Sequence, residues 1–194
     1  MQATDSGVTL SASDVVDFLA CTHLTALDLH RLKRPDDSPA PLPPDEQAQL
    51  LAAKGLDWER RWLERLRAAH PDLVEIAVGA DVPREARQAA AVAATLAAMA
   101  QGAPVIYQAS LAAPGFFGRA DFLRRVPGRS RFGDWGYEVI DTKYAQSARA
   151  GHVLQLSFYS WLLEAAQETP PRRMHLVTGD GVETGYRVAD FAHY

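Results

Sequence analysis

The segment Tyr137–Lys143 ends in an acid and a base whose spacing suits chemistry on one face of a strand. Its sequence, Tyr-Glu-Val-Ile-Asp-Thr-Lys, is rich in β-branched residues, which favour a strand. Because strand side chains alternate between two faces, Asp141 and Lys143 share a face and project side by side. A surface salt bridge on a sheet edge is the alternative for a lone Asp-x-Lys. The pair indicates a functional site only in combination with the other residues described below.

A second carboxylate, Asp121, lies in the segment Gly118–Val126, which we also expect to form a strand. The turn-rich residues 127–136 predict a hairpin between the two strands, and this pairing would bring Asp121 close to Asp141. Two carboxylates at close range repel each other unless a cation lies between them. Ligation by oxygen alone suits Mg²⁺, with water and substrate phosphate completing the coordination. The alternative is a hairpin in which Asp121 pairs with a neighbouring arginine.

Glu59 is a third carboxylate, placed by helical spacing in the middle of an apolar stripe with Leu56, Trp62, Leu63 and Leu66. Burying an unpaired carboxylate is costly, so Glu59 needs a partner. A metal ion or a buried arginine would serve. A lone charge at the margin of the stripe is the alternative.

Gln155 and Tyr159 are four residues apart in a segment of helical periodicity, so they share one face of the expected helix. A helix flank that carries hydrogen-bonding side chains is the alternative. No single one of these signals is specific. Their order is informative: a helix glutamate, a strand aspartate, an Asp-x-Lys and a helix with Gln-x-x-x-Tyr.

Apolar periodicity and chain breakers predict helices before and after a central group of strands. The order favours an α/β fold with a mixed central β-sheet flanked by helices, and we expect residues 1–194 to form one domain. The expected helices cover residues 9–32, 44–69, 83–100 and 151–167, and the expected strands cover residues 73–78, 105–111, 118–126, 137–143, 174–178 and 184–188.

Composition places the chain among soluble globular proteins. Its 194 residues carry 20 basic and 24 acidic side chains, a formal net charge of −4, and 47% are hydrophobic, which excludes a disordered or collagen-like chain. Lysine is rare among the basic residues, so Lys143 stands out from an arginine-rich background. Cys21 is the single cysteine, which excludes an internal disulfide. No leader or membrane-spanning segment is recognisable, so we expect a cytoplasmic protein without a membrane partner.

The ordered motifs resemble those of the PD-(D/E)XK nuclease superfamily, and more narrowly its RecB-like branch. Residues 11–21 are similar to the opening helix of these nucleases, and the resemblance extends over residues 10–190. It includes the RecB-type exonucleases associated with CRISPR systems and the RecB-like nuclease domains that precede a helicase domain in long bacterial proteins. The resemblance implies a restriction-endonuclease-like core. The four matching motifs are Gly55-x-x-x-Glu59, Gly118-Arg-Ala-Asp121, Val139-Ile-Asp141-Thr-Lys143 and Gln155-x-x-x-Tyr159.

The resemblance implies a DNA nuclease that hydrolyses phosphodiester bonds with Mg²⁺ or Mn²⁺, in DNA repair, recombination or defence. Lys143 would position the attacking water or stabilise developing charge. Gln155 and Tyr159 would orient the DNA or the lysine. The implied metal ligands are Glu59, Asp121, Asp141 and the backbone carbonyl of Thr142.

The implied partners are DNA, single-stranded or with free ends, and a helicase domain or protein. The weak negative charge of the chain gives no support of its own for a nucleic-acid partner. For the arginines, ordinary solvated surface is the alternative. Those that would contact DNA phosphates are Arg119, Arg124, Arg125 and Arg149.

Two features depart from the family pattern. Many RecB-like members carry a histidine in the first motif, where this chain has Glu59. Some members hold an iron–sulfur cluster with four cysteines, but Cys21 alone cannot hold one, so we expect no cluster within this chain. Two alternative functions stay open: a nucleic-acid-binding module with weak or lost catalysis attached to a helicase, and a structure-specific, junction-type endonuclease of the same superfamily.

Overall fold

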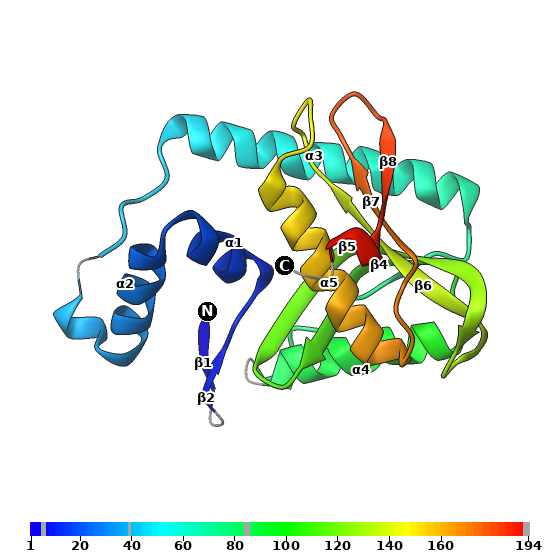
Figure 1. Ribbon diagram of the computed structural model, residues 1–194, viewed down its shortest axis with the longest axis horizontal. Coiled ribbons are helices and arrows are strands. Elements are labelled where there is room, and N and C mark those ends of the chain that lie inside the picture. The colour runs from blue at the N-terminus through cyan, green and yellow to red at the C-terminus, as the bar shows by residue number, and fades with distance from the viewer. Residues whose placement is uncertain (5–6, 39, 84–85, 192–194) are drawn as a thin grey trace.

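A six-stranded mixed sheet flanked by helices forms the centre of the computed structural model, which describes residues 1–4, 7–38, 40–83 and 86–191 (Figure 1). The strand order is β3-β4-β5-β6-β7-β8. This arrangement confirms the predicted α/β class with a mixed central sheet. The strands are β3 (Val74–Glu75), β4 (Val105–Ala113), β5 (Phe116–Ser130), β6 (Gly133–Thr142), β7 (Arg173–Val177) and β8 (Glu183–Arg187).

The antiparallel strands β4, β5 and β6 form the part of the sheet that carries the predicted aspartates. Phe122 of β5 pairs with Ile140 of β6, and the next position along this register sets Asp121 opposite Asp141. β6 and β7 run parallel, as do β3 and β4. A parallel pair needs a crossover connection, and helix α5 (Ala150–Gln167) supplies it between β6 and β7.

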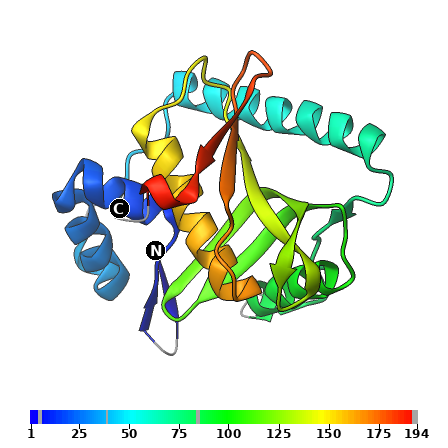
Figure 2. The same ribbon diagram turned by 45° about the vertical axis from the view of Figure 1, so that its right-hand side comes forward.

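Helices bury the two faces of the sheet in separate clusters of apolar side chains. Leu123 and Val139 pack in a cluster with residues of α5 and of α4 (Arg87–Ala100). Their chain neighbours Phe122 and Ile140 pack instead with residues of α3 (Glu46–Ala69), as strand alternation requires. Figures 1 and 2 show α5 lying along the sheet while α3 spans the top of the molecule. Within the described ranges, the helices are all too short or too polar to cross a membrane.

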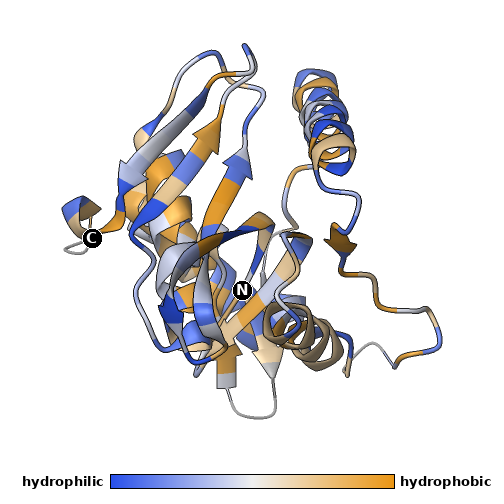
Figure 3. Ribbon diagram, turned by 90° about the vertical axis from the view of Figure 1, so that its right-hand side faces the viewer, coloured by the Kyte–Doolittle hydropathy of each residue, from blue (hydrophilic) through white to orange (hydrophobic). Residues whose placement is uncertain are grey.

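Only the second half of α3 contributes to the core. Trp58 and Leu63 are buried, whereas Leu56 is 56% exposed, so the predicted apolar stripe was wrong at its first member. Asp45 caps the start of this helix, because its carboxylate accepts a hydrogen bond from the backbone N–H of Ala48 at 2.7 Å. Hydrophilic and hydrophobic residues are mixed around its circumference (Figure 3). The buried stripe therefore fixes the rotation of α3 and carries Glu59 toward the sheet.

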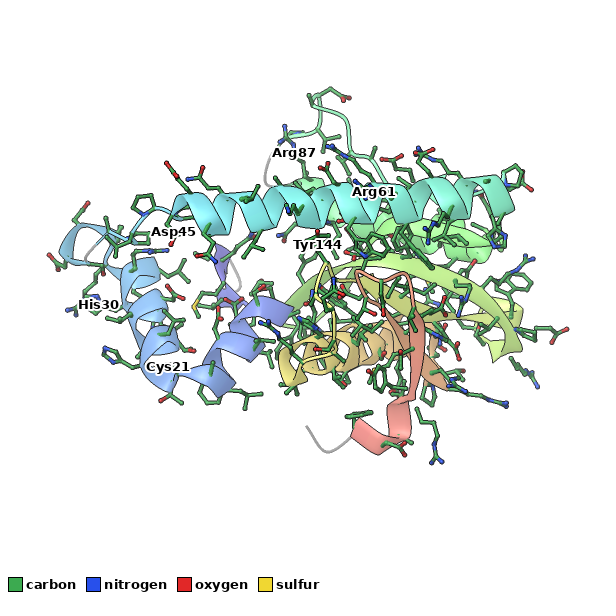
Figure 4. The ribbon with its side chains drawn as sticks, turned by 90° about the horizontal axis from the view of Figure 1, so that it is seen from above. Cys21, His30, Asp45, Arg61, Arg87 and Tyr144 are labelled. Carbon is green, nitrogen blue, oxygen red and sulfur yellow. The ribbon has the colours of Figure 1, made fainter. Side chains whose placement is uncertain are left out.

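The structure departs from the expected elements near the N-terminus. The expected helix over residues 9–32 is two helices, α1 (Ala12–Ala20) and α2 (Thr22–Lys33). They are separated at Cys21, labelled in Figure 4, whose backbone is extended with φ −161° and ψ 103°. Two short strands that carry no periodic signal, β1 (Gln2–Thr4) and β2 (Gly7–Thr9), form a small separate sheet.

Other helices and strands begin or end at residues that differ from the expected ones. The strand expected at residues 73–78 shrinks to β3, and the helix expected over residues 83–100 is observed as α4, with residues 84–85 outside the described part of the chain. The turn expected over residues 127–136 is largely strand, because cross-strand pairs such as Pro127 with Trp135 extend the ladder past the glycines.

A polar network crosses β5 to β8 on one face of the sheet. His175 is buried and lies between two carboxylates, with Nε2 2.9 Å from Glu138 and Nδ1 2.9 Å from Glu183. Arg124 forms an ion pair with Glu183 at 2.8 Å. Burial alone lowers the pKa of His175, but its hydrogen bonds to Glu138 and Glu183 outweigh burial and raise it. The contact with His175 lowers the pKa of Glu183 to about 2.

These shifts predict a stability maximum in mildly acidic solution. The contribution of His175 is complete below its unfolded pKa of 6.5 and is lost as pH rises through the higher folded pKa. The contribution of Glu183 is present above its unfolded pKa of 4.5 and is lost as pH falls toward about 2. His175→Gln should therefore cost roughly 2 kcal/mol of unfolding free energy between these limits, and less on either side. Urea unfolding of both proteins across this pH range measures the difference, and a pH-independent difference would contradict the assignment.

Candidate active site

Asp121 and Asp141 lie opposite each other at one end of the paired region of β5 and β6, and each has different partners. The Oδ2 atom of Asp121 accepts hydrogen bonds from the backbone N–H and the hydroxyl of Thr142, both at 2.8 Å. Asp141 is fully buried, and the Nζ atom of Lys143 lies 2.6 Å from its Oδ2. Neither oxygen of Asp141 accepts a hydrogen bond of good geometry from the described residues. Asp141 is therefore a buried acceptor group with spare capacity.

The electrostatics of this pair are dominated by burial. Burial and, to a smaller extent, the charge of Asp121 raise the pKa of Asp141, Lys143 opposes both, and the net pKa is about 7. Burial lowers the pKa of Lys143, but the carboxylates of Asp141 and Asp121 outweigh burial, so its pKa rises and it stays protonated. Strand alternation predicted that the aspartate and the lysine lie side by side, and the structure brings them together.

Glu59 reaches the same region from helix α3. Its Oε1 atom accepts hydrogen bonds from the hydroxyl of Tyr107, at 2.9 Å, and from the side-chain amide of Gln108. Burial and the charge of Asp121 raise the pKa of Glu59, while the two hydrogen bonds act in the opposite direction. Burial and the contact with Glu59 raise the pKa of Tyr107 to about 12. Glu59 thus has neutral partners, and Arg119 acts on it only through its charge.

Gln108 is a functional candidate that sequence reasoning missed. It lies inside β4 with a φ of 55°, in the left-handed region that a residue with a Cβ rarely adopts. Such a conformation costs roughly 1–3 kcal/mol and persists only where the surroundings enforce it. No pattern of residue types announces it, because glutamine has no preference for this region. Only the contact with Glu59, 49 positions earlier in the chain, reveals its role.

Helix α5 closes the site from the other side. The amide of Gln155 donates to the hydroxyl of Tyr159 at 2.9 Å, as expected for residues one helical turn apart. Tyr159 is buried, and its pKa is raised by burial and by the charges of Asp141 and Asp121. The helix packs very closely on Gly118, where an added Cβ would lie 2.9 Å from the ring of Tyr159. The glycine of the second predicted motif therefore makes room for the tyrosine of the last one.

The four predicted DNA-binding arginines are dispersed. Arg119 is exposed beside the acidic cluster, and Arg149 is exposed at the start of α5. Arg124 is bound in the network of His175, and Arg125 donates to the carbonyl of Gly102. The structure thus places Arg119 near the acidic cluster and Arg149 in a small cavity with Gln155, and it engages the other two in contacts within the protein.

A cleft of about 580 Å³ opens next to the acidic cluster. No acidic side chain lines it within the described residues. Arg87 of α4, labelled in Figure 4, and Arg119 of β5 both line the cleft. The polar residues that line the cleft include Ser11, Ser13, Arg87, Gln108, Arg119 and Tyr159.

The residues present fit a hard divalent cation. The charge of Asp121 raises the pKa of both Glu59 and Asp141, and Lys143 is the only cation paired with these carboxylates among the described residues. The donors are all oxygen, and Asp141 leaves buried acceptor capacity unused, as Mg²⁺ or Mn²⁺ requires. The described residues hold no group of three or more acidic, histidine or cysteine side chains already gathered around one point. A shift of Glu59, or coordination through water, would complete such a site.

Comparison with models of known protein families gives no match for this chain, and comparison with the sequences of curated proteins gives none either. The case for a function therefore rests on the side chains and on the motifs that they form.

Substituting Gly118 by alanine tests the close packing of α5. The new Cβ would lie 2.8 Å from Leu162 and 2.9 Å from Tyr159, so the helix must shift outward. We expect Gly118→Ala to lower the free energy of unfolding by about 1–3 kcal/mol in urea titrations. Gly55→Ala is the matched control, because its Cβ meets nothing within 4 Å and alanine favours a helix. Equal effects of the two substitutions would show that the contact with Tyr159 is not tight.

Substituting Asp141 by asparagine tests the burial of its charge. In the metal-free protein its raised folded pKa of about 7 makes ionisation unfavourable for folding, so stability falls as pH rises from 3.8 toward 7. Asp141→Asn removes this dependence and should stabilise the protein at pH 8 in EDTA by roughly 1–3 kcal/mol. Urea unfolding at acidic and alkaline pH measures the gain. A loss of stability at alkaline pH would mean that the ion pair with Lys143 outweighs the burial of the carboxylate.

Proposed function

We propose that this protein is a metal-dependent DNA nuclease of the PD-(D/E)XK type. The observation that carries the proposal is the buried Asp141 beside Asp121 and Lys143, reached from α3 by Glu59. Buried like charges are unfavourable in an empty protein, and a divalent cation with a phosphate ligand offsets them. A cluster of charges that lowers the stability of the fold in this way is typical of a catalytic site.

The proposed reaction is hydrolysis of a phosphodiester bond. Glu59, Asp121 and Asp141 would hold Mg²⁺ or Mn²⁺, with the carbonyl of Thr142 as a further ligand. When bound, such a cation supplies charge stabilisation at the phosphoryl oxygens and lowers the pKa of water. Lys143 holds its proton at Nζ and would orient water or stabilise the developing negative charge.

Side chains of helix α5 would orient the substrate or Lys143. Tyr159 lines the cleft, and its hydroxyl is oriented by Gln155. Arg87 and Arg119 line the cleft and no acidic side chain of the described residues does, which favours a polyanion such as DNA. A helicase partner is proposed from the motif resemblance alone.

The order of elements supports the nuclease over unrelated metal-dependent hydrolases. The glutamate lies on a helix, the two aspartates on adjacent antiparallel strands, and the glutamine and tyrosine on the crossover helix that follows. The same order accompanies the motifs of the resembling superfamily. We therefore propose a restriction-endonuclease-like core for the part of the chain from α3 to β7.

A binding module without catalysis is the second candidate, favoured by the internal partners of the acids. Thr142 occupies one oxygen of Asp121, and Tyr107 and Gln108 occupy one oxygen of Glu59. Calorimetric titration with Mn²⁺ separates the two functions. Binding that is lost in Asp121→Ala supports the nuclease, whereas absent binding, or binding unchanged by that substitution, supports the module. Preference for branched DNA over linear DNA in cleavage assays would favour the junction-type endonuclease.

Cleavage of linear single- and double-stranded DNA tests the nuclease proposal directly. We expect cleavage that requires Mg²⁺ or Mn²⁺ and stops with EDTA. Asp121→Ala and Lys143→Ala should each lower the rate at least about a hundredfold, because each removes charge that acts on the transition state. Lys143→Arg should fail as well, since the guanidinium group is too large for the space beside Asp141.

Lys33→Ala is the matched control, because Lys33 is exposed on α2 and should leave the rate unchanged. Circular dichroism must show that all variants are folded. Cleavage by the Asp121→Ala and Lys143→Ala proteins at the wild-type rate would eliminate the assigned roles.

A further inference from the structure

Two consecutive residues of β4 donate to the same carboxylate oxygen. The Tyr107 hydroxyl and the Gln108 amide both contact Oε1 of Glu59. In a regular strand, consecutive side chains point to opposite faces, so one of the two would point away from α3. The left-handed backbone of Gln108, with φ 55°, breaks this alternation. The unusual conformation and the shared hydrogen-bond acceptor are thus one structural feature.

The position of this feature in the ladder argues against an ordinary turn or bulge. Tyr107 pairs with Phe122 and Ala109 pairs with Ala120, so the register is the same before and after Gln108. The other non-glycine residue with positive φ in the described chain is Glu168, at the C-cap of α5, where left-handed backbone is common. Gln108 therefore keeps an unfavourable conformation inside a continuous strand, opposite the position of Asp121.

The two donors determine where Glu59 points. Arg119 is the cation whose charge acts on Glu59, and it is exposed on β5. Without the two donors, the carboxylate would be free to turn toward this arginine and solvent. With them, Oε1 is occupied, while Oε2 accepts no hydrogen bond from the described residues. One oxygen is anchored and the other is left for a ligand.

We propose that Tyr107 and Gln108 are positioning residues that hold Glu59 ready to complete the cation site of Asp121 and Asp141. This inference rests on the proposed function. The two residues act through Glu59 and touch neither the cation nor the substrate. The left-handed conformation of Gln108 turns a second donor toward the carboxylate.

The test uses two substitutions, each of which removes one hydrogen-bond donor and preserves the backbone conformation. Gln108→Gly keeps the left-handed conformation, which glycine adopts freely, and removes the amide. Tyr107→Phe removes the hydroxyl alone. Each should weaken Mn²⁺ binding about tenfold in calorimetry, as is usual when the partner of a metal ligand is lost. Tyr186→Phe on β8 is the control and should leave the affinity unchanged.

A double-substitution cycle shows whether the effect passes through Glu59. In the Glu59→Gln background, Gln108→Gly should cause no further loss of Mn²⁺ affinity, because the group that it positions is already absent. An equal loss in both backgrounds would overturn the proposal, since Gln108 would then act on its own. Unchanged affinity in both single deletions would overturn it as well.

A metal-free measurement keeps this inference separate from the proposed function. In EDTA, carbon-13 NMR titration of the Glu59 carboxyl should show a higher pKa in Gln108→Gly and in Tyr107→Phe than in wild type. The reason is that both donors stabilise the charged form. A wild-type protein that binds no Mn²⁺ would refute the metal site, yet these titrations would still show whether the donors hold Glu59. Titration curves identical to that of wild type would overturn the holding role itself.

Discussion

The excess of negative charge around Asp141 is the constraint on which the arrangement of the surrounding elements depends. A fully buried carboxylate lies opposite another carboxylate, with a third nearby, and one lysine partly offsets them. Folding alone does not favour such a cluster, since buried like charges repel in a medium of low dielectric. The surrounding elements must therefore hold these groups in place. The antiparallel β5–β6 pair sets the two aspartates opposite each other, and the apolar stripe of α3 directs Glu59 inward.

The hydrogen-bond partners of the three carboxylates show how the protein limits the free-energy cost of burying them. Thr142 satisfies Asp121 with its main chain and side chain, so this carboxylate keeps its place without a cation. Tyr107 and Gln108 do the same for Glu59. Asp141 differs, because its partner among the described residues is the ammonium of Lys143, whose side chain is 26% exposed. Two of the carboxylates thus have hydrogen-bond donors from the protein, and the third has only its ion pair within the described residues.

Local rules were sufficient for the features that lie on one element or on neighbouring strands. Alternation placed Asp141 beside Lys143, helical spacing placed Gln155 beside Tyr159, and the hairpin brought Asp121 to Asp141. The same rules could not find Gln108, whose conformation is set by a partner 49 residues away. They also missed the break at Cys21, and they missed the extension of the hairpin past its glycines because cross-strand pairing decides that boundary.

The parallel pairing of β6 with β7 has a consequence for the synthesis of the chain. The backbone N–H of Lys143 donates to the carbonyl of Val177 at 2.9 Å, so the end of β6 is pinned by a strand made 34 residues later. Tyr159 and the rest of the crossover helix come between them in the chain. This backbone contact of Lys143 therefore cannot form while the ribosome is still making α5. Long-range contacts of this kind form late in folding, which keeps the candidate site incomplete until nearly all of the described chain is available.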